Sequence, residues 1–324
     1  MAILPLPLQA FTTPKSPLQC SSIPWQYAPS RCPCDRLTYA MAAGPMLAWR
    51  FGGPLLRRAF STTIRTPTYN RVPRARTVAL AAWKQEVLWA EAPLLEISRA
   101  AESLYHVALD ISDNPELMAG HTTPGQFVQV RVGDSRPTFL AIASSPEVSG
   151  GGLLEFLIKD VEGSTAELIC DLRKGDTVEL SQVMGNGFDI DQLSPPDKFP
   201  TVFLFATGSG ISPIRSLLES GFDAHKRFDV RLYYGVRNLQ RMAYQERFKK
   251  WESSGVKIFP VLSKPDDGWS GERGYVQEAF AKAQQIQNPL ATGAVLCGHK
   301  QMTEDVTSLL VAEGVLMEKI LKNF

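Results

Sequence analysis

The sequence predicts two domains of different class: an antiparallel β-barrel over residues 83–193, then a Rossmann-like parallel α/β domain over residues 199–324. Three observations predict this order. The first stretch consists of short alternating segments between turn residues, the second alternates apolar strands with helices, and a proline-rich linker at 194–197 separates them. Each stretch holds roughly 120 residues, a comfortable size for one core.

The barrel prediction rests on the spacing of short strands. Apolar and polar residues alternate within five segments, and the turn residues Pro124-Gly125, Gly133-Asp134 and 150–152 lie between them. One helical pattern, at 165–172, interrupts the strands near the end of the domain. The expected strands are 94–98, 105–111, 126–132, 153–158 and 177–180.

In the second domain, apolar strands alternate with helical segments. This alternation predicts a parallel sheet, because parallel neighbours need a crossover connection that is usually a helix. The expected strands are 202–205, 230–234, 256–262 and 294–297, and the expected helices are 211–220, 244–251, 276–283 and 302–312.

The most informative segment is 201–215, where an apolar strand runs into Gly208-Ser209-Gly210 and a helix follows at once. Glycines let the backbone approach a pyrophosphate, and the amides of the first helical turn direct partial positive charge at it. The turn departs from the Rossmann fingerprint, because Pro213 and Ile214 stand where a third glycine would lie. The segment therefore predicts a nucleotide-binding turn of a different family.

Residues 1–79 differ in composition from the rest of the chain. They carry ten basic residues and the single acid Asp35, which leaves 24 of the 34 basic and 32 of the 33 acidic residues for the remainder. We expect an organelle transit peptide, and a disordered tail that stays attached is the alternative. The abundant Ser, Thr and Pro before Met41 favour a plastid, whereas the segment 57–62 resembles a mitochondrial cleavage region.

Composition also argues against several classes of function. The mildly acidic remainder argues against nucleic acid as a partner, and no apolar run approaches the roughly 18 residues of a membrane span. Beyond residue 79 only Cys170 and Cys297 remain, which cannot support a disulfide framework or a four-cysteine iron–sulfur cluster. We predict no metal site, because the four histidines lack ligand spacing: His106, His121, His225 and His299.

An ordered set of motifs resembles the ferredoxin-NADP reductase superfamily, in which an FAD-binding barrel precedes a nicotinamide-binding domain. The resemblance covers about residues 83–324, and with its leader the chain is similar to an organelle-targeted, plant-like member. Each motif is weak alone, but their order is specific. The matching segments are 124–128, 136–146, Glu162-Gly163-Ser164-Thr165, 174–176, 184–188, 206–213 and Cys297-Gly298 with Met302.

The resemblance implies an FAD site on the barrel. Segment 136–146 would be the flavin-binding strand, and the loop 162–165 would bind the FAD pyrophosphate through hydroxyls and through the amides that open the next helix. An ordinary helix N-cap is the alternative for this loop, and a solvated side chain is the alternative for Arg136. The expected FAD-binding residues are Arg136, Leu140, Ala141, Ile142, Ala143, Ser144, Gly163, Ser164 and Thr165.

The chain departs from the family pattern at two positions of this strand. Leu140 and Ala141 align where members usually present an aromatic residue and a Ser or Thr beside the isoalloxazine and its N5 atom. A hydroxyl near N5 is therefore missing, which favours a slow or specialised acceptor reaction. Barrel core is the alternative role for both side chains.

The resemblance also implies a nicotinamide-nucleotide site on the second domain. Cys297 would lie beside the reacting carbon of the nicotinamide, and the C-terminal Phe324 would lie against the flavin; simple packing is the alternative for both. No acid follows the second strand, where Arg237 stands, so NADPH is favoured over NADH. The expected residues are Thr207, Gly208, Ser209, Gly210, Arg237, Ser263, Lys264, Arg273, Tyr275, Cys297 and Gly298.

Together these residues predict an FAD-dependent NAD(P)H oxidoreductase. Hydride would pass from NADPH or NADH to FAD, and electrons would leave to a separate acceptor, a small molecule or a carrier protein, that the sequence does not identify. Cys297 and Phe324 are the candidates closest to the reaction. The alternative function is a catalytically weak or regulatory module with the same fold. The expected location is a plastid, with a mitochondrion as the alternative.

Overall fold

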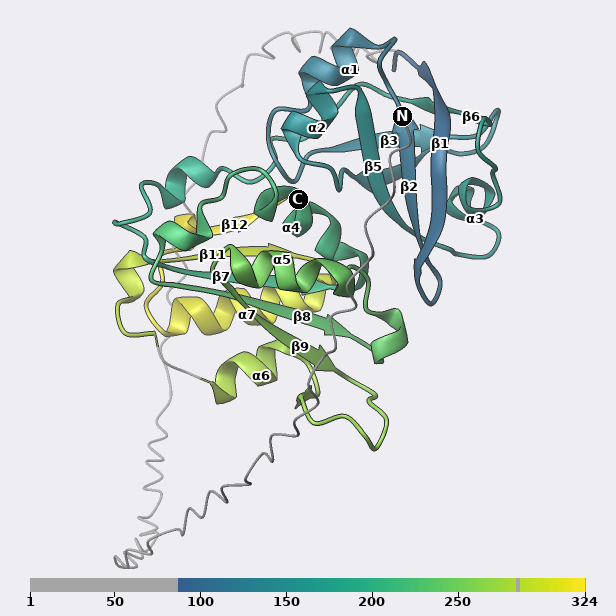
Figure 1. Cartoon of the computed structure of the whole chain (residues 1–324). Coiled ribbons are helices and arrows are strands. Elements are labelled where there is room, and N and C mark those ends of the chain that lie inside the picture. The colour runs from purple at the N-terminus through teal and green to yellow at the C-terminus, as the bar shows by residue number, and fades with distance from the viewer. Residues whose placement is uncertain (1–86, 284–285, 324) are drawn as a thin grey trace, which may run out of the picture. The chain divides into compact units, whose positions relative to one another are not determined.

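The computed structural model describes residues 87–283 and 286–323 (Figure 1). The predicted transit peptide, residues 1–79, and the C-terminal Phe324 lie outside the described residues. Within the described ranges, every helix is too short or too polar to cross a bilayer. In the same ranges, no group of three or more His, Cys, Asp or Glu side chains is placed to hold a metal ion.

The first part of the described chain forms a six-stranded antiparallel sheet with the order β4-β3-β6-β1-β2-β5. Its two edge strands approach each other at one β-bridge, between Ile142 and Phe156, and the Ala143 amide donates to the Glu155 carbonyl at 2.8 Å. The sheet is therefore barrel-like, without a continuous closing ladder. The strands are β1 (Ala90–Ala101), β2 (Leu104–Asp110), β3 (Phe127–Arg131), β4 (Thr138–Ala141), β5 (Leu153–Lys159) and β6 (Thr177–Leu180).

Three short helices connect these strands: α1 (Pro115–Gly120), α2 (Pro146–Gly150) and α3 (Thr165–Cys170). The sequence predicted α3 and missed the other two. With six and five residues, α1 and α2 are too short to show a helical repeat of apolar positions. Alternate residues of the strands meet in one core, which includes Leu94, Val107, Val128, Phe156 and Val178.

The second part forms a six-stranded parallel sheet with the order β10-β9-β8-β7-β11-β12 (Figure 1). The four predicted strands are present, and the sequence missed the short edge strands β10 and β12. The predicted fold class, a barrel-like antiparallel sheet before a parallel α/β sheet, is confirmed. The strands are β7 (Thr201–Thr207), β8 (Asp229–Val236), β9 (Val256–Leu262), β10 (Glu272–Arg273), β11 (Thr292–Cys297) and β12 (Ile320–Lys322).

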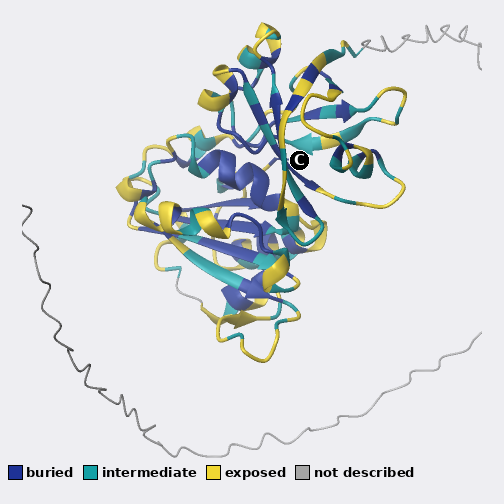
Figure 2. Ribbon diagram, turned by 45° about the vertical axis from the view of Figure 1, so that its right-hand side comes forward, coloured by how far each residue is buried: buried dark blue, intermediate teal, exposed yellow. Residues whose placement is uncertain are grey.

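Helices cover both faces of the parallel sheet. Along β7, Val202 and Leu204 pack in one core with α4 (Ile211–Leu218) and α5 (Phe248–Ser253). The intervening Phe203 and Phe205 pack in another core with helices α6 (Val276–Lys282) and α7 (Lys300–Ala312). The central strands β7 and β11 are consequently buried on both sides, and dark blue ribbons mark such buried strands in Figure 2.

Helix α5 begins at Phe248, whereas the sequence predicted a helix over 244–251. Tyr244 has a φ of 63°, in the left-handed region, which a helix interior does not accommodate. Its ring instead lies under the guanidinium of Arg215, 5.0 Å from the ring centre. Helical periodicity does not signal such a contact, so the predicted start was wrong by about one turn.

Candidate active site

The predicted phosphate-binding turn lies at the C-terminal end of β7. Residues Gly208–Gly210 form a turn of 3-10 helix, and α4 starts at Ile211. Gly208 has a φ of 55°, and a Cβ atom added there would meet no heavy atom within 4 Å. The space next to this backbone is open, as the approach of a phosphate requires.

The end of β11 packs directly against this turn. A Cβ atom on Gly210 would lie 2.5 Å from the Cys297 carbonyl oxygen, so only glycine fits there. Gly298, with a φ of 140°, lies against Thr207, and the His299 amide donates to the Thr207 hydroxyl at 2.8 Å. The ends of two neighbouring strands thus form one tightly packed corner.

A cavity of about 680 Å³ is lined both by this corner and by β4. The wall from β4 includes Leu140 and Ala141, and the wall from the parallel sheet includes the glycine turn and Cys297. Residues predicted for FAD and residues predicted for the nicotinamide nucleotide therefore meet in one space. The predicted residues that line it are Leu140, Ala141, Ser164, Thr207, Gly208, Ser209, Gly210, Cys297 and Gly298.

The thiol of Cys297 is buried at the edge of this cavity. Burial raises the pKa of Cys297 to about 12 and outweighs a hydrogen bond with Asn323, which lowers it. The sulfur is therefore a neutral thiol near pH 7. A neutral buried thiol can pack against a ligand, but it is a poor nucleophile.

Part of the predicted flavin strand faces away from the cavity. The side chains of Ile142, Ala143 and Ser144 are fully buried, and none of them lines it. The Ser144 hydroxyl accepts a hydrogen bond from the Glu155 amide at 3.1 Å, and the Ile142 amide donates to the Gln126 carbonyl at 3.0 Å. These residues hold the strand in the barrel core. Leu140 and Ala141 line the cavity, and Leu140 also packs against the barrel core, as its alternative role predicted.

The predicted pyrophosphate loop opens helix α3. The Ser164 hydroxyl donates to the Val161 carbonyl at 2.6 Å, and the Thr165 hydroxyl donates to the Arg136 carbonyl at 2.5 Å. Both hydroxyl protons are therefore engaged with the backbone, contrary to the donor role expected for them. The Arg136 side chain is exposed and does not line the cavity. Gly163, with a φ of 72°, has open space beside it for a ligand.

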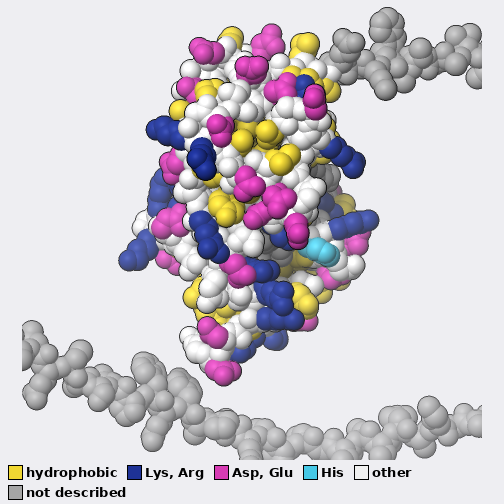
Figure 3. All heavy atoms as spheres, turned by 90° about the vertical axis from the view of Figure 1, so that its right-hand side faces the viewer, with side chains coloured by type: hydrophobic (Ala, Val, Ile, Leu, Met, Phe, Trp, Pro, Cys, Tyr) yellow, Lys and Arg dark blue, Asp and Glu magenta, His cyan; other side chains and the backbone are white. Residues whose placement is uncertain are grey.

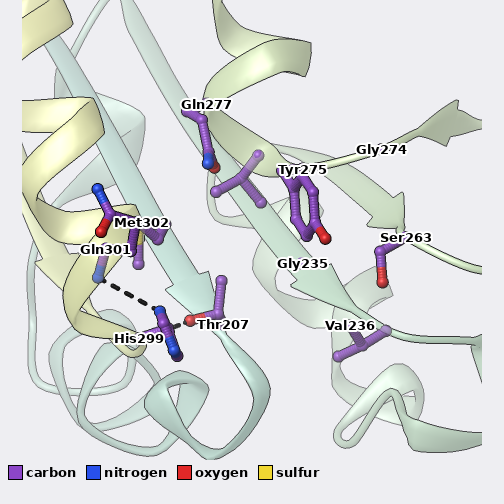
Figure 4. Close-up of a pocket in the computed structure, with 11 residues that line it drawn as sticks. Thr207, Gly235, Val236, Ser263, Gly274, Tyr275, Gln277, His299, Gln301 and Met302 are labelled. Atoms are coloured by element: carbon purple, nitrogen blue, oxygen red, sulfur yellow. Dashed lines mark hydrogen bonds between the residues drawn. The ribbon is translucent and has the colours of Figure 1, made fainter.

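Thr207 also lines a second cavity, of about 440 Å³ (Figure 4). Two residues predicted for the nicotinamide nucleotide, Ser263 and Tyr275, line the same space, and Tyr275 is 59% exposed. Figure 4 shows His299 linked by hydrogen bonds to Gln301 and Thr207. The arrangement provides an open groove next to the glycine turn.

The three predicted cations differ in position. Arg237 lines a third cavity, of about 210 Å³, together with the glycine turn. Lys264 is exposed and lines none of these three cavities. Arg273 donates to the Trp269 carbonyl at 2.6 Å, so its guanidinium is bound to the backbone of its own loop. Arg237 is therefore the best placed of the three for an anionic group.

Sequence reasoning missed several residues that line the 680 Å³ cavity. Ser212 lies inside the recognised segment 206–213, where its side chain could have been marked as a second hydroxyl. Lys159 ends the observed strand β5, one residue beyond the predicted strand 153–158, and no pattern signals that this end reaches the glycine turn. The missed residues include Thr138, Phe139, Lys159, Ser212 and His299.

Comparisons with known proteins give a consistent picture. Residues 204–308 match the family model described as an oxidoreductase NAD-binding domain. The fruit protein pKIWI502 of Actinidia deliciosa is 42% identical over 304 residues, which cover 90% of both chains. The chloroplastic ferredoxin-NADP reductase leaf isozyme 1 of Arabidopsis thaliana is 26% identical over 192 residues, which cover 56% of this chain and 51% of that protein.

A solved structure shares the fold. The ferredoxin NADP+ reductase from Neisseria gonorrhoeae, determined with bound FAD and NADP, matches 72% of this chain and 97% of its own with a TM-score of 0.59 and 21% identity. The same succession of an antiparallel and a parallel sheet underlies both. The chain thus belongs to the ferredoxin-NADP reductase superfamily, as a member of the same family as the fruit protein pKIWI502.

Proposed function

We propose that this protein is a flavin-dependent NAD(P)H oxidoreductase, which passes hydride from NAD(P)H to a bound FAD and electrons onward to a separate acceptor. The observation that carries the proposal is the 680 Å³ cavity shared by β4 and the corner of Gly208 and Cys297. A reaction between two cofactors needs their binding surfaces to meet at contact distance. This cavity offers such a meeting point.

The residues around the cavity fit a flavin ring. Leu140 and Ala141 provide an apolar wall for a flat aromatic group, and the volume is in the usual range for a ligand site. When bound, FAD supplies a hydride acceptor that can release electrons singly or in pairs. The chain would bind and orient the cofactor: β4 residues 138–141 would contact the flavin, with residues 142–144 holding the strand in place, and residues 163–165 would bind the pyrophosphate mainly through backbone groups.

The parallel sheet would bind the nicotinamide nucleotide. Backbone amides of the glycine turn and of the start of α4 would hold the pyrophosphate, and the neutral Cys297 with Gly298 would lie beside the nicotinamide ring. Because both reacting groups belong to cofactors, no side chain has to transfer a proton in the hydride step. Phe324, outside the described residues, remains a predicted contact of the flavin.

NADPH is the proposed donor, with NADH as the alternative. Arg237 lines the small cavity beside the glycine turn. Glu102 is the one carboxylate among the residues that line this cavity, and it forms an ion pair with Arg241 at 2.9 Å. In the described part of the chain no carboxylate forms an ion pair with Arg237, so a 2′-phosphate would meet its positive charge directly. Ser263 and Tyr275 offer a hydroxyl and an aromatic face in the neighbouring groove.

The acceptor would be a small molecule or an electron-carrier protein. On the face shown in Figure 3, Lys and Arg side chains are interspersed with Asp and Glu side chains, with no large basic patch for an acidic carrier. We propose a plastid location, which is supported by the leader composition and by the chloroplastic relative, with a mitochondrion as the alternative.

An anaerobic titration tests this function. The purified protein is expected to bind FAD, to be yellow, and to lose its absorbance near 450 nm in ~1:1 proportion to added NADPH, because one hydride fully reduces one flavin. Stopped-flow rates with NADPH and with NADH then rank the two donors. A colourless protein that does not bind added FAD would instead support the alternative function, a regulatory module with the same fold.

A further inference from the structure

The flavin-facing wall of β4 has no side-chain hydrogen-bonding group at the positions of Leu140 and Ala141. Hydride transfer changes the hydrogen bonding of the ring nitrogen that receives the hydride. This nitrogen accepts a hydrogen bond before the reaction and carries an N–H group, a donor, after it. A hydroxyl satisfies both states because it is at once donor and acceptor. A hydroxyl close to Ala141 could therefore serve this nitrogen both before and after the reaction.

Ser212, in the first turn of α4, lies at that place. Its hydroxyl is 3.4 Å from the carbonyl oxygen of Ala141, and both residues line the 680 Å³ cavity. The side chain belongs to a residue that is only 2% exposed. A separation of 3.4 Å is longer than the ~2.7–2.8 Å of a strong O–H···O bond. The hydrogen bond from the Ser212 hydroxyl to the Ala141 carbonyl is therefore weak and costs little to break.

A second serine on the same face of α4 provides a contrast. Ser216 follows Ser212 by one helical turn, and its hydroxyl donates to the Ser144 carbonyl at 2.7 Å. Ser216 is fully buried and lines none of the cavities beside the glycine turn. Ser216 makes a short structural bond to the barrel, whereas Ser212 makes a long one at the edge of an open space.

Helix α4 is held firmly enough to position this hydroxyl. The Arg215 guanidinium donates to the Glu155 carboxylate of β5 at 2.6 Å, and the Gly210 turn before the helix packs on β11. The start of α4 is thereby fixed against the barrel on one side and the parallel sheet on the other.

Building on the proposed flavin site, we propose that Ser212 contacts the flavin and supplies, from the parallel-sheet domain, the hydroxyl that Ala141 lacks on the barrel side. The Ser212 hydroxyl turns from the Ala141 carbonyl to the ring nitrogen that receives the hydride. Binding of the flavin to the barrel thus becomes sensitive to a residue of the nucleotide-binding domain.

The test compares Ser212→Ala with the matched control Ser216→Ala, each in the full chain with FAD. Ser212→Ala is expected to shift the visible flavin spectrum, to weaken FAD binding a few-fold in a fluorescence titration, and to slow anaerobic reduction by NADPH about 10-fold or more. Ser216→Ala is expected to keep the wild-type spectrum and reduction rate and to lose only stability, because its bond lies outside the cavity. The double variant Ala141→Ser/Ser212→Ala, which returns a hydroxyl from the barrel side, is expected to recover most of the rate.

The outcomes separate this inference from the proposed function. A wild-type protein that binds FAD and is reduced, together with a Ser212→Ala variant that has the wild-type spectrum, affinity and rate, overturns the role of Ser212 alone. A wild-type protein that binds no flavin overturns both proposals. If Ser212→Ala fails to fold, the nearly isosteric variant Ser212→Cys tests the role of the hydroxyl instead. A thiol forms only weak hydrogen bonds, so this variant should show the same spectral shift and a slower reduction.

Discussion

The guanidinium of Arg215 on α4 donates to the carboxylate of Glu155 on β5 at 2.6 Å, so that a buried ion pair joins the parallel sheet's helix to the barrel-like sheet. The two side chains are only 3% and 12% exposed. The other carboxylate oxygen of Glu155 lies 3.4 Å from His106, and Arg215 also contacts Glu219 at 3.2 Å. The pair therefore belongs to a charge network that orders the contact between the two sheets.

We expect Arg215→Met to destabilise the protein by about 3–5 kcal/mol, because it leaves the Glu155 carboxylate buried without its principal partner. The double change Arg215→Met/Glu155→Gln should cost less than the single change, because the unpaired charge is gone. Urea unfolding measures both. The more exposed pair of Arg131 and Glu179, 29% and 26% exposed, is the control: Arg131→Met should cost only about 1 kcal/mol or less. Equal losses for Arg215→Met and Arg131→Met would contradict the argument.

Gly210→Ala tests the corner between β7 and β11. The added methyl group would lie 2.5 Å from the Cys297 carbonyl, so the two strand ends must separate. We expect a loss of about 1–3 kcal/mol in stability and a weaker binding of NADPH, measured by thermal unfolding and by titration. Gly150→Ala is the control, since a Cβ atom there meets nothing within 4 Å, and its stability should change by roughly 0.5 kcal/mol at most.

The state of the Cys297 thiol predicts its reactivity. Because burial raises its pKa from 9.0 to about 12, only about one molecule in 10⁴ carries the thiolate at pH 8, against about one in ten for an ordinary cysteine. We expect native Cys297 to react with iodoacetamide about 10³-fold more slowly than it does in the urea-unfolded chain. Peptide mapping by mass spectrometry follows each cysteine separately. Fast labelling of Cys297 in the folded protein would show that the thiolate is accessible.

The fold could be read from the sequence where elements are long and bounded by clear signals. Segment 201–215 gave the strand, the turn and the helix that carry the site, because glycine and an apolar run mark each boundary. The sequence shows no such signal for the helices α1 and α2. The left-handed conformation of Tyr244 makes α5 start later than the sequence predicted. Short elements and left-handed residues depend on tertiary contacts, which a local pattern does not contain.

The candidate site could be predicted as a set of segments but not as a set of side chains. Strand alternation does not reveal which residues of 136–144 face a second domain, and the structure gives this role to Leu140 and Ala141 while it buries Ile142, Ala143 and Ser144. The position of Ser212 against Ala141 joins residues 71 positions apart. Such pairings follow from how two domains pack, and one sequence carries no record of that packing.

A buried histidine predicts how stability depends on pH. His121 is 2% exposed, and its Nδ1 atom is 2.7 Å from the Ser149 hydroxyl. Burial lowers its pKa from 6.5 to about 4 and outweighs the charge of Glu147, which raises it. A lowered pKa means that its contribution is complete above pH 6.5 and is lost as the pH falls towards 4. This contribution amounts to about 3 kcal/mol. Urea unfolding between pH 7.5 and 4.5 should therefore show a steeper loss for the wild type than for His121→Asn. Parallel curves would exclude His121 as the cause.

Arg237 is the cation that we propose selects NADPH over NADH. Arg237 lines the small cavity at the glycine turn, whereas Arg273 donates its guanidinium protons to the carbonyl oxygens of Asp266 and Trp269. We expect Arg237→Gln to raise the KM for NADPH about 10-fold or more and to leave the KM for NADH nearly unchanged, because only the 2′-phosphate needs the charge.

Arg273→Gln is the matched variant for this comparison. It should loosen its loop and affect both nucleotides to a similar degree, because Arg273 shapes the backbone rather than the phosphate site. Steady-state kinetics with both donors, or flavin-reduction rates if turnover is slow, measure the ratio of the two effects. If Arg273→Gln removes the preference for NADPH and Arg237→Gln does not, the 2′-phosphate binds in the groove of Ser263 and Tyr275 instead of beside Arg237.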